Sequence, residues 1–296
     1  MSRPDYDGGL LLFEEKTNSI RIYNGEYKKK LGQKDILWEW LAADAKSAGF
    51  RSSFSKTKND VKQVMWRGEL HLLAVSSRGD GVALIRFDDG ELAYYRKVVG
   101  SVHSATVTPR DNIVLADSKG YVRLLSTRTG KTSQCPVNSA HGVVWDKKQE
   151  LLWAWGGGGR IVGFPLGGSA QNPTLVCRKA KRFVGGPSGG HDLQPMLDGN
   201  QMLIGSAGPN IFFFDPLLDW PHFRWGFMQR FPGETGIKGV SRNSKTGEII
   251  YVKNDRSYGY KFRSNKIRSL DGRVREVEGR TAFYKARWFQ PNCFSW

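Results

Sequence analysis

The stretch "SVHSATVTPRDNIVLADSKGYVRLLSTRTG", Ser101 to Gly130, contains three short apolar segments separated by turn residues. The segments are "SVHSATV", "NIVLADS" and "YVRLL", and the turn "TRTG" follows the last of them. Segments of this length, rich in Val, Ile, Leu and Tyr and bounded by Gly, Asp and Asn, are typical of β-strands. The stretch therefore predicts a small antiparallel sheet built from consecutive strands.

The same arrangement recurs along the whole chain at intervals of roughly 35 to 50 residues, which is the spacing of β-propeller blades. Strongly apolar strands begin at Gly9, His71, Asn112, Leu151, Gln201 and Ile249. A second strand follows each of them: "SIRIY", "VALIRF", "YVRLL", "RIVGF", "NIFFF" and "SYGYKF". Six strand pairs predict six blades. The only stretch with a partly helical pattern is Ile36 to Ala48.

Each blade also needs an innermost strand, and five blades have one directly before the apolar strand: "DVKQVMW", "SVHSATV", "AHGVVW", "GHDLQPM" and "GIKGVSR". The first blade lacks one, but "AFYKARWF", Ala282 to Phe289, is a spare strand at the other end of the chain. We therefore predict an all-β fold, a single six-bladed β-propeller over residues 1–296, with the ring closed by the C-terminal strand joining the first blade. The expected blades cover residues 8–58 with 281–290, then 59–99, 100–137, 138–184, 185–232 and 233–280.

The composition limits the possible partners. Lys and Arg number 45 against 28 Asp and Glu, so the net charge is +17 and the protein attracts anions. The basic residues are scattered, and no base-stacking motif or recognition helix accompanies them, so nucleic acid is not the expected partner. No stretch is long enough to span a membrane, and we expect a monomer. The first residues lack the apolar core of a signal peptide, which predicts a cytoplasmic protein or a secreted one whose signal peptide has been removed.

The three cysteines, Cys135, Cys177 and Cys293, are odd in number and have no paired spacing. This pattern predicts that the chain has no disulfide framework.

Alignment of the six innermost strands places a basic or metal-ligating side chain at the equivalent position of every blade: Lys62, His103, His141, His191, Lys238 and Lys285. Innermost strands line the central channel, so we expect these side chains to converge near one end of it, with a histidine half facing a lysine half. A single histidine on such a strand is more often a structural residue. Recurrence in six blades favours a functional site, because unpaired lysines would lower one another's pKa and a bound anion would relieve their repulsion.

The series "VHSATVTPRDN", "AHGVVWD", "GHDLQP", "IKGVS" and "YKARW" resembles an uncharacterised propeller family of bacteria and fungi, a domain of unknown function, over nearly the whole chain. That resemblance implies the fold and no activity. The general layout is also similar to propeller-fold polysaccharide lyases such as the oligogalacturonate lyases, which hold a metal with clustered histidines. This second likeness is architectural, and those enzymes have seven blades.

The predicted ring suits two kinds of chemistry. His103, His141 and His191 could bind a divalent metal ion (Mn, Zn or Ca) and leave positions open for substrate, but neutral imidazoles serve equally well as proton-transfer groups. Asp192 could orient an imidazole, and it is also a candidate for substrate binding. The lysines suit a carboxylate, which Arg287 could grip with two hydrogen bonds.

The reaction that uses both halves of the ring is β-elimination from a uronate-containing saccharide. A cation or metal stabilises the enolate that forms beside the carboxylate, and a neutral histidine or lysine takes the adjacent proton. A glycoside hydrolase would need two facing carboxylates, and near the ring the innermost strands offer only Asp192. We therefore predict a carbohydrate-active enzyme with an anionic saccharide substrate, acting as a lyase.

Two alternatives stay open: hydrolysis of an anionic glycoside, and a non-catalytic propeller that binds a sugar or anion or serves as a scaffold. The aromatic and basic stretch "WPHFRWGF", Trp220 to Phe227, is expected on an outer loop. Trp225 could stack on a sugar there, and His222 is a weaker candidate for substrate binding.

Overall fold

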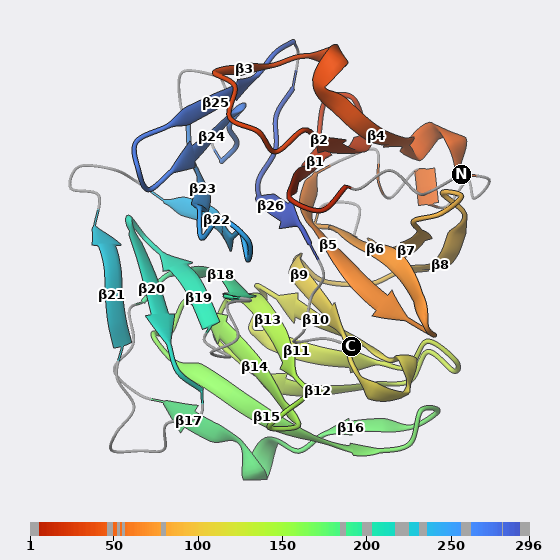
Figure 1. Ribbon diagram of the computed structural model, residues 1–296. Coiled ribbons are helices and arrows are strands. Elements are labelled where there is room, and N and C mark those ends of the chain that lie inside the picture. Colours follow the sequence, from red (N-terminus) through yellow and green to blue (C-terminus); the bar gives the residue numbers. More distant parts are fainter. Residues whose placement is uncertain are drawn as a thin grey trace.

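The repeated strands fold into six sheets within the part of the chain that the computed structural model describes (Figure 1). The described residues are 6–45, 50–51, 54, 57–77, 81–183, 188–196, 203–216, 225–230, 236–255, 262–279 and 281–290. The predicted all-β architecture is confirmed. Among these residues, no helix is both long and apolar enough to cross a membrane.

The sheet that holds the N-terminal strand is called sheet 1. The other five are numbered in the order in which their innermost strands follow along the chain. Sheet 1 has the order β26 (Ala286–Phe289), β1 (Gly9–Glu14), β2 (Ser19–Tyr23), β4 (Ile36–Leu41). Sheet 2 has the order β5 (Lys58–Trp66), β6 (Glu69–Ser76), β7 (Gly81–Arg86), β8 (Leu92–Lys97). Sheet 3 has the order β9 (Val102–Val107), β10 (Ile113–Asp117), β11 (Tyr121–Leu125), β12 (Thr132–Pro136).

The other three sheets follow the same plan, and two of them, sheets 4 and 6, have a fifth strand. Sheet 4 contains β13 (Ala140–Asp146), β14 (Leu151–Gly156), β15 (Ile161–Gly168) and β16 (Pro173–Leu175), and β17 (Lys181–Phe183) also pairs with β15. Sheet 5 contains β18 (Gly190–Pro195), β19 (Leu203–Ala207), β20 (Asn210–Phe214) and β21 (Trp225–Arg230). Sheet 6 contains β22 (Ile237–Arg242), β23 (Ile249–Lys253), β24 (Lys266–Ser269), β25 (Val274–Val277) and β3 (Lys30–Leu31).

The innermost strands lie around a common centre, with the outer strands radiating from them (Figure 1). β5 contacts β9, β9 contacts β13, β13 contacts β18, β18 contacts β22, β22 contacts β26, and β26 contacts β5. The second strands pack against neighbouring sheets on both faces, so β1, β10 and β14 are buried at every residue. This double burial explains why the apolar runs are continuous in the sequence.

The two ends of the chain meet in two places. The strand predicted from "AFYKARWF" pairs with the first strand, with Gly9 opposite Phe289 and Leu12 opposite Ala286. The sequence did not indicate the second link, in which the short strand β3 pairs in parallel with β25 of sheet 6. Residues near the N-terminus therefore contribute to both the first and the last sheet.

Two local predictions need correction. Within the partly helical pattern at Ile36 to Ala48, the described residues 36–45 form a strand, β4, followed by a single 3-10 turn, Ala42–Asp44. Trp38 and Trp40 project from one face of this strand, so its pattern has the period of two typical of a strand. In sheet 6 the third strand is Lys266–Ser269 rather than "SYGYKF", most of which lies outside the described residues.

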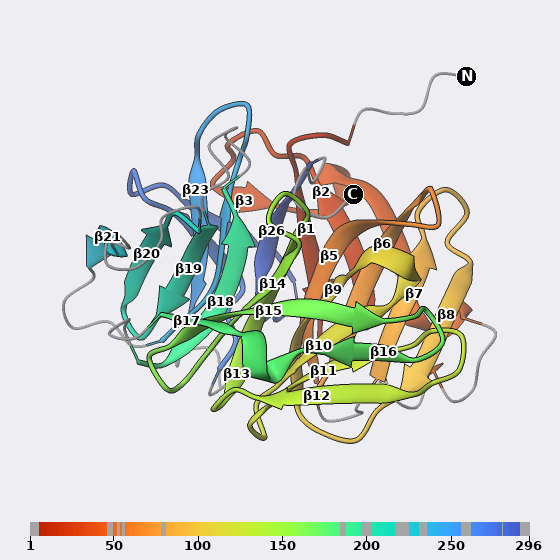
Figure 2. The same ribbon diagram turned by 90° about the horizontal axis from the view of Figure 1, so that it is seen from below.

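The prediction of no disulfide is also wrong, because Cys135 and Cys177 are bonded to each other. Cys135 lies in β12, and Cys177 begins the 3-10 turn Cys177–Lys179 that follows β16. These outer strands of sheets 3 and 4 lie beside each other (Figure 2), which brings the two Cα atoms to 5.6 Å. The cysteines are 42 residues apart, about one repeat, so their pairing becomes visible only once the sheets are placed side by side.

Candidate functional site in the central channel

The innermost strands share an irregularity at the level of the histidines. In each of five strands the pairing with the second strand shifts by one residue, leaving an extra residue that bulges out of the ladder. These extra residues are Asn59, His103, His141, His191 and Lys238. Bulges redirect side chains, and they are common beside functional sites.

The sixth innermost strand has the same shift. Leu12 pairs with Ala286, whereas the amide of Glu15 bonds to the carbonyl of Ala282, so one extra residue lies between 282 and 286. We assign it to Tyr284, because its ring centroid lies 5.8 Å from that of His103. We call Asn59, His103, His141, His191, Lys238 and Tyr284 the bulge layer.

The register corrects the sequence alignment at two positions. Lys62 lies three residues beyond Asn59, and Lys285 lies one residue beyond Tyr284, so neither lysine belongs to the bulge layer. The residues that directly follow the bulges form a second layer: Asp60, Ser104, Gly142, Asp192, Gly239 and Lys285. The three predicted lysines are therefore distributed over three levels of the channel.

Four buried side chains form an ion-pair network below the histidines, which we call the central network: Asp60, Asp192, Lys285 and Arg287. Lys285 Nζ lies 3.1 Å from Asp192 Oδ1 and 3.3 Å from Asp60 Oδ2. Arg287 donates to Asp192 Oδ2 at 2.6 Å and to Asp60 Oδ1 at 2.9 Å. Two carboxylates and two cations thus neutralise each other.

The backbone completes this network. Lys285 Nζ also donates to the carbonyls of His103 at 3.2 Å and His141 at 3.5 Å, and the amide of Val240 donates to Asp192 at 2.9 Å. A Cβ on Gly239 would lie 2.9 Å from the Cβ of Lys285, so only glycine leaves room for the lysine there. The network is therefore built into the strands that carry it.

Electrostatics keep Asp192 and Arg287 ionised. Burial opposes the charge on Asp192, but the neighbouring Arg287 and Lys285 outweigh it and hold the pKa of that carboxyl well below its ordinary value. Burial likewise acts against the charge of Arg287, and the charges of Asp192 and Asp60 raise its pKa nevertheless. Asp192 and Arg287, predicted to bind substrate, are occupied with each other.

The expectation of three unpaired lysines is wrong. Lys62 Nζ donates to the carbonyl of Val143 at 3.0 Å and lies 4.0 Å from Asp60 Oδ2. Lys238 Nζ lies 2.9 Å from His191 Nε2. The pKa values of Lys62 and Lys238 are both lowered to about 8, but burial is the main cause, ahead of repulsion between cations.

The three histidines form a continuous arc, as predicted. The ring centroids of His103 and His141 are 4.1 Å apart, and those of His141 and His191 are 5.0 Å apart. Burial lowers the pKa of all three, and that of His141 falls to about 4. The arc is therefore uncharged at neutral pH.

Hydrogen bonds fix the protonation of two of these rings. His141 Nδ1 lies 2.7 Å from the carbonyl of Ser139, which can only accept, so Nδ1 carries the proton and Nε2 carries the free electron pair. His191 Nε2 accepts from Lys238. The Nδ1 atoms of His103 and His191 are buried and have no hydrogen-bond partner in the described part of the chain.

Cations gather around the arc. Lys238 is joined by Arg263, whose guanidinium lies 4.6 Å above the Tyr284 ring and donates to Glu15 at 2.6 Å. The charge of Arg263 helps to lower the pKa of His103 and that of Lys58, which burial lowers to about 8. Arg263 and Lys58 thus share the carboxylate of Glu15, and together with Lys238 they make the histidine end of the channel electropositive.

The three histidines of the arc are poorly placed to bind a metal ion. Among the described residues, no three His, Cys, Asp or Glu side chains are placed to hold one. His191 Nε2 is engaged by a lysine, and the rings of His103 and His141 lie against each other. The metal-ligand role of the three histidines stays a prediction that elemental analysis can test.

The other end of the channel is different. A cavity of about 40 Å³ there is lined by Lys62, Gln194, Ser241 and Arg287 together with neighbouring residues. The central network separates this small polar cavity from the histidine arc. This cavity is too small for a ligand of more than a few atoms.

The remaining predicted residues lie on the outer part of sheet 5. Trp225 begins β21, but its side chain is not among those described, and His222 lies outside the described residues. The sequence missed Asp60, Tyr284 and Arg263. Aligning "ND" at Asn59 with "HD" at His191 would have revealed Asp60, whereas Arg263 lies off the innermost strands and gave no repeated signal.

Comparison with known proteins supports the architecture. The sequence profile of the Family of unknown function (DUF6528) matches residues 11–296. The β-propeller domain of Cps50 (Swd1) from Myceliophteria thermophila is 12% identical with a TM-score of 0.52, and the match covers 92% of this chain and 86% of that one. A functionally unknown protein from Desulfotomaculum acetoxidans is also 12% identical with a TM-score of 0.52, covering 90% and 94%. These likenesses show the β-propeller fold alone, and no curated protein matches the chain.

Proposed function

Because the chain belongs to the Family of unknown function (DUF6528), its activity has to be inferred from the channel, and we propose that the histidine end is the active site of an enzyme acting on an acidic saccharide. We also propose that the six sheets are the blades of a closed six-bladed propeller, supported by the contacts from each innermost strand to the next and by the pairing of β26 with β1. In this proposal the central network is the floor of the active site.

One observation carries the proposal: an uncharged histidine with a defined free electron pair lies in an electropositive surrounding. His141 keeps its proton on Nδ1 and presents Nε2 as a base, and its pKa of about 4 keeps it uncharged at pH 7. Lys238 supplies positive charge beside His141, and Arg263 supplies it beside His103. A base beside cations suits removal of a proton next to a carboxylate.

The proposed reaction is β-elimination from a uronate-containing saccharide. Lys238 neutralises the substrate carboxylate, which makes the proton on the adjacent carbon more acidic. His141 Nε2 takes that proton, the electron pair forms a carbon–carbon double bond, and the glycosidic oxygen leaves with a proton from water or from Tyr284. The roles predicted for Lys285 and Arg287 thereby pass to Lys238 and Arg263, because the former two are committed to Asp60 and Asp192.

Hydrolysis is disfavoured by the same contacts. A glycoside hydrolase needs one carboxyl as an acid and another as a base or nucleophile. Asp60 and Asp192 are both buried, and each makes ion pairs with Lys285 and Arg287. A non-catalytic anion receptor is the second candidate, favoured by the cations Lys238 and Arg263 beside the histidine arc, which would bind a carboxylate with or without chemistry.

The test is a screen of uronate oligosaccharides for the ultraviolet absorbance of an unsaturated product, with binding measured in parallel by calorimetry. His141→Gln keeps a hydrogen-bonding side chain but cannot act as a base, so turnover should fall by about 10²-fold or more while binding is kept. His71→Gln is the matched control, because His71 lies in β6, outside the channel, and its ring meets that of Trp66 edge to face. Binding without product in the unmodified protein would favour the receptor. Absence of both would refute the proposal.

Metal analysis of the purified protein belongs to the same experiment. A stoichiometric divalent ion whose removal abolishes turnover would assign the histidines as ligands and would contradict His141 as the base.

A further inference from the structure

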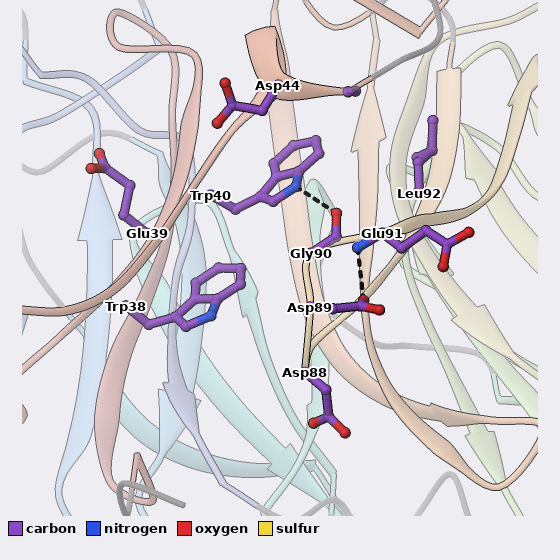
Figure 3. Close-up of a pocket in the computed structure, with 10 residues that line it drawn as sticks. Trp38, Glu39, Trp40, Asp44, Asp88, Asp89, Gly90, Glu91 and Leu92 are labelled. Atoms are coloured by element: carbon purple, nitrogen blue, oxygen red, sulfur yellow. Dashed lines mark hydrogen bonds between the residues drawn. The ribbon is translucent and has the colours of Figure 1, made fainter.

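A second pocket lies between sheets 1 and 2, away from the channel. It has a volume of about 830 Å³, within the range of ligand sites. Figure 3 shows Trp38 and Trp40 of β4 on one wall and the turn from Asp88 to Glu91 on the other. We propose that this pocket binds an arginine- or lysine-containing peptide segment of another protein.

The walls of the pocket are firmly held. Trp40 is buried and its Nε1 donates to the carbonyl of Gly90 at 2.9 Å. Gly90 has φ +70°, and a Cβ there would lie 2.9 Å from Trp40, so glycine allows this close approach. The Trp38 ring lies 5.0 Å from that of Phe87. A pocket that is already ordered loses little entropy when a ligand binds.

The charge of the pocket is opposite to that of the whole protein. Asp89 and Glu91 line the pocket and share the single guanidinium of Arg86, which leaves a net charge of −1 there. Asp44 and Asp88 line the same pocket. On a chain of net charge +17, this local excess of carboxylates indicates a cationic ligand.

Two further features specify the type of cation. Carboxylates stand on both walls, Asp44 on one side and the turn at Asp88 on the other, so the pocket can neutralise more than one positive centre (Figure 3). Trp38 is only half-buried, and an indole face attracts guanidinium and ammonium groups. An indole N–H can also donate to an acceptor such as a peptide carbonyl. A basic peptide offers both cations and carbonyls.

The experiment uses the full chain and a fluorescein-labelled peptide of alternating glycine and arginine, with a glycine–citrulline peptide of equal length as the uncharged counterpart. Fluorescence anisotropy at low salt should show the arginine peptide binding at least about tenfold tighter than the citrulline peptide. The double variant D44N/D88N should weaken arginine-peptide binding at least about fivefold. The double variant D271N/E278Q removes the same two charges from exposed positions outside the pocket and should leave binding unchanged.

Three results would overturn the proposal. Equal weakening by both double variants would mean that only the overall charge matters. Equal binding of the citrulline peptide, or no binding of either peptide, would exclude recognition of a basic segment. If sedimentation shows the chain associating with itself, and only D44N/D88N abolishes this, then the occupant is a second copy and not another protein. His141→Gln should not alter peptide binding, which keeps this test separate from that of the channel.

Discussion

At the scale of single residues, the central network determines what the channel can do. Asp60 and Asp192 turn two of the predicted substrate-binding cations, Lys285 and Arg287, into structural residues. Nothing in the residue types indicated this division, because a lysine or arginine on an innermost strand suits a substrate and a buried partner equally well. The side chains of the network bind one another, so in the proposed function the histidine arc provides the reactive groups.

Removal of one carboxylate should show how much the central network contributes to the free energy of unfolding. Asp192→Ala leaves Lys285 and Arg287 buried with a single shared counter-charge, and loss of one partner from a buried ion pair costs about 3–5 kcal/mol. Urea unfolding should show a decrease of that size in the free energy of unfolding. Asp271→Ala, at an exposed position, should change it by less than about 1 kcal/mol. A loss below about 1 kcal/mol for Asp192→Ala would contradict the network as drawn.

The pKa values at the histidine end predict a bell-shaped pH dependence for the proposed activity. His141 must be uncharged to act as a base, so kcat/KM should fall as pH drops through about 4. Lys238 must be charged to bind a carboxylate, so the rate should also fall as pH rises through about 8. Lys238→Arg keeps its charge at higher pH and should move the alkaline limit upward. An unchanged alkaline limit in this variant would exclude Lys238 from the reaction.

At the scale of the strands, the bulges decide which residues meet. The apolar strands were predictable because each buries both faces and repeats. The position of the extra residue in each innermost strand was not predictable. Asn59 has no chemical likeness to His103, and Lys62, three residues later, gave a better match by residue type. The three histidines were found correctly because "VHS", "AHG" and "GHD" share their place before the strand. Tyr284 and Asp60 were missed through the same shift of register.

The link between sheets 3 and 4 gives a prediction at this scale. The disulfide between Cys135 and Cys177 closes a loop of 42 residues, for which restriction of the unfolded chain predicts about 2–4 kcal/mol of stabilisation. Cys135→Ser should lower the free energy of unfolding by that amount, and a reducing agent should do the same to the unmodified protein. Cys293→Ser should have no such effect. Equal stability of the reduced and oxidised protein would show that the bond contributes nothing to the fold.

At the scale of the whole molecule, the sequence predicted the all-β architecture and the return of the last strand to the first. It did not predict the pairing of β3 with β25, because two residues carry no recognisable strand pattern. Nor did it predict Arg263 at the histidine end, since this residue reaches the channel from outside the innermost strands. Contacts between distant segments depend on where the chain turns, which local patterns do not record.

Shortening the chain tests the role of the last strand. Removal of residues 282–296 deprives β1 of its partner and takes Lys285 and Arg287 from the two buried carboxylates. We expect this protein to lose its cooperative thermal transition by circular dichroism. A chain ending at residue 290 retains the strand and should melt in a single transition. Cooperative melting of the shorter protein would show that sheet 1 is stable without β26.

The pairing of the first strand with the last also has a consequence for synthesis on the ribosome. Sheets 2 to 5 consist of consecutive strands and can form as they emerge, but β1 and β3 must wait for β26 and β25. At about 5–20 residues per second this delay is about 15–55 seconds. For that time the apolar strand β1, "GLLLFE", pairs with β2 on one side only, and the edge that will receive β26 is unpaired. Such an edge is a binding site for holding chaperones, so the step most exposed to aggregation is the last one in assembly.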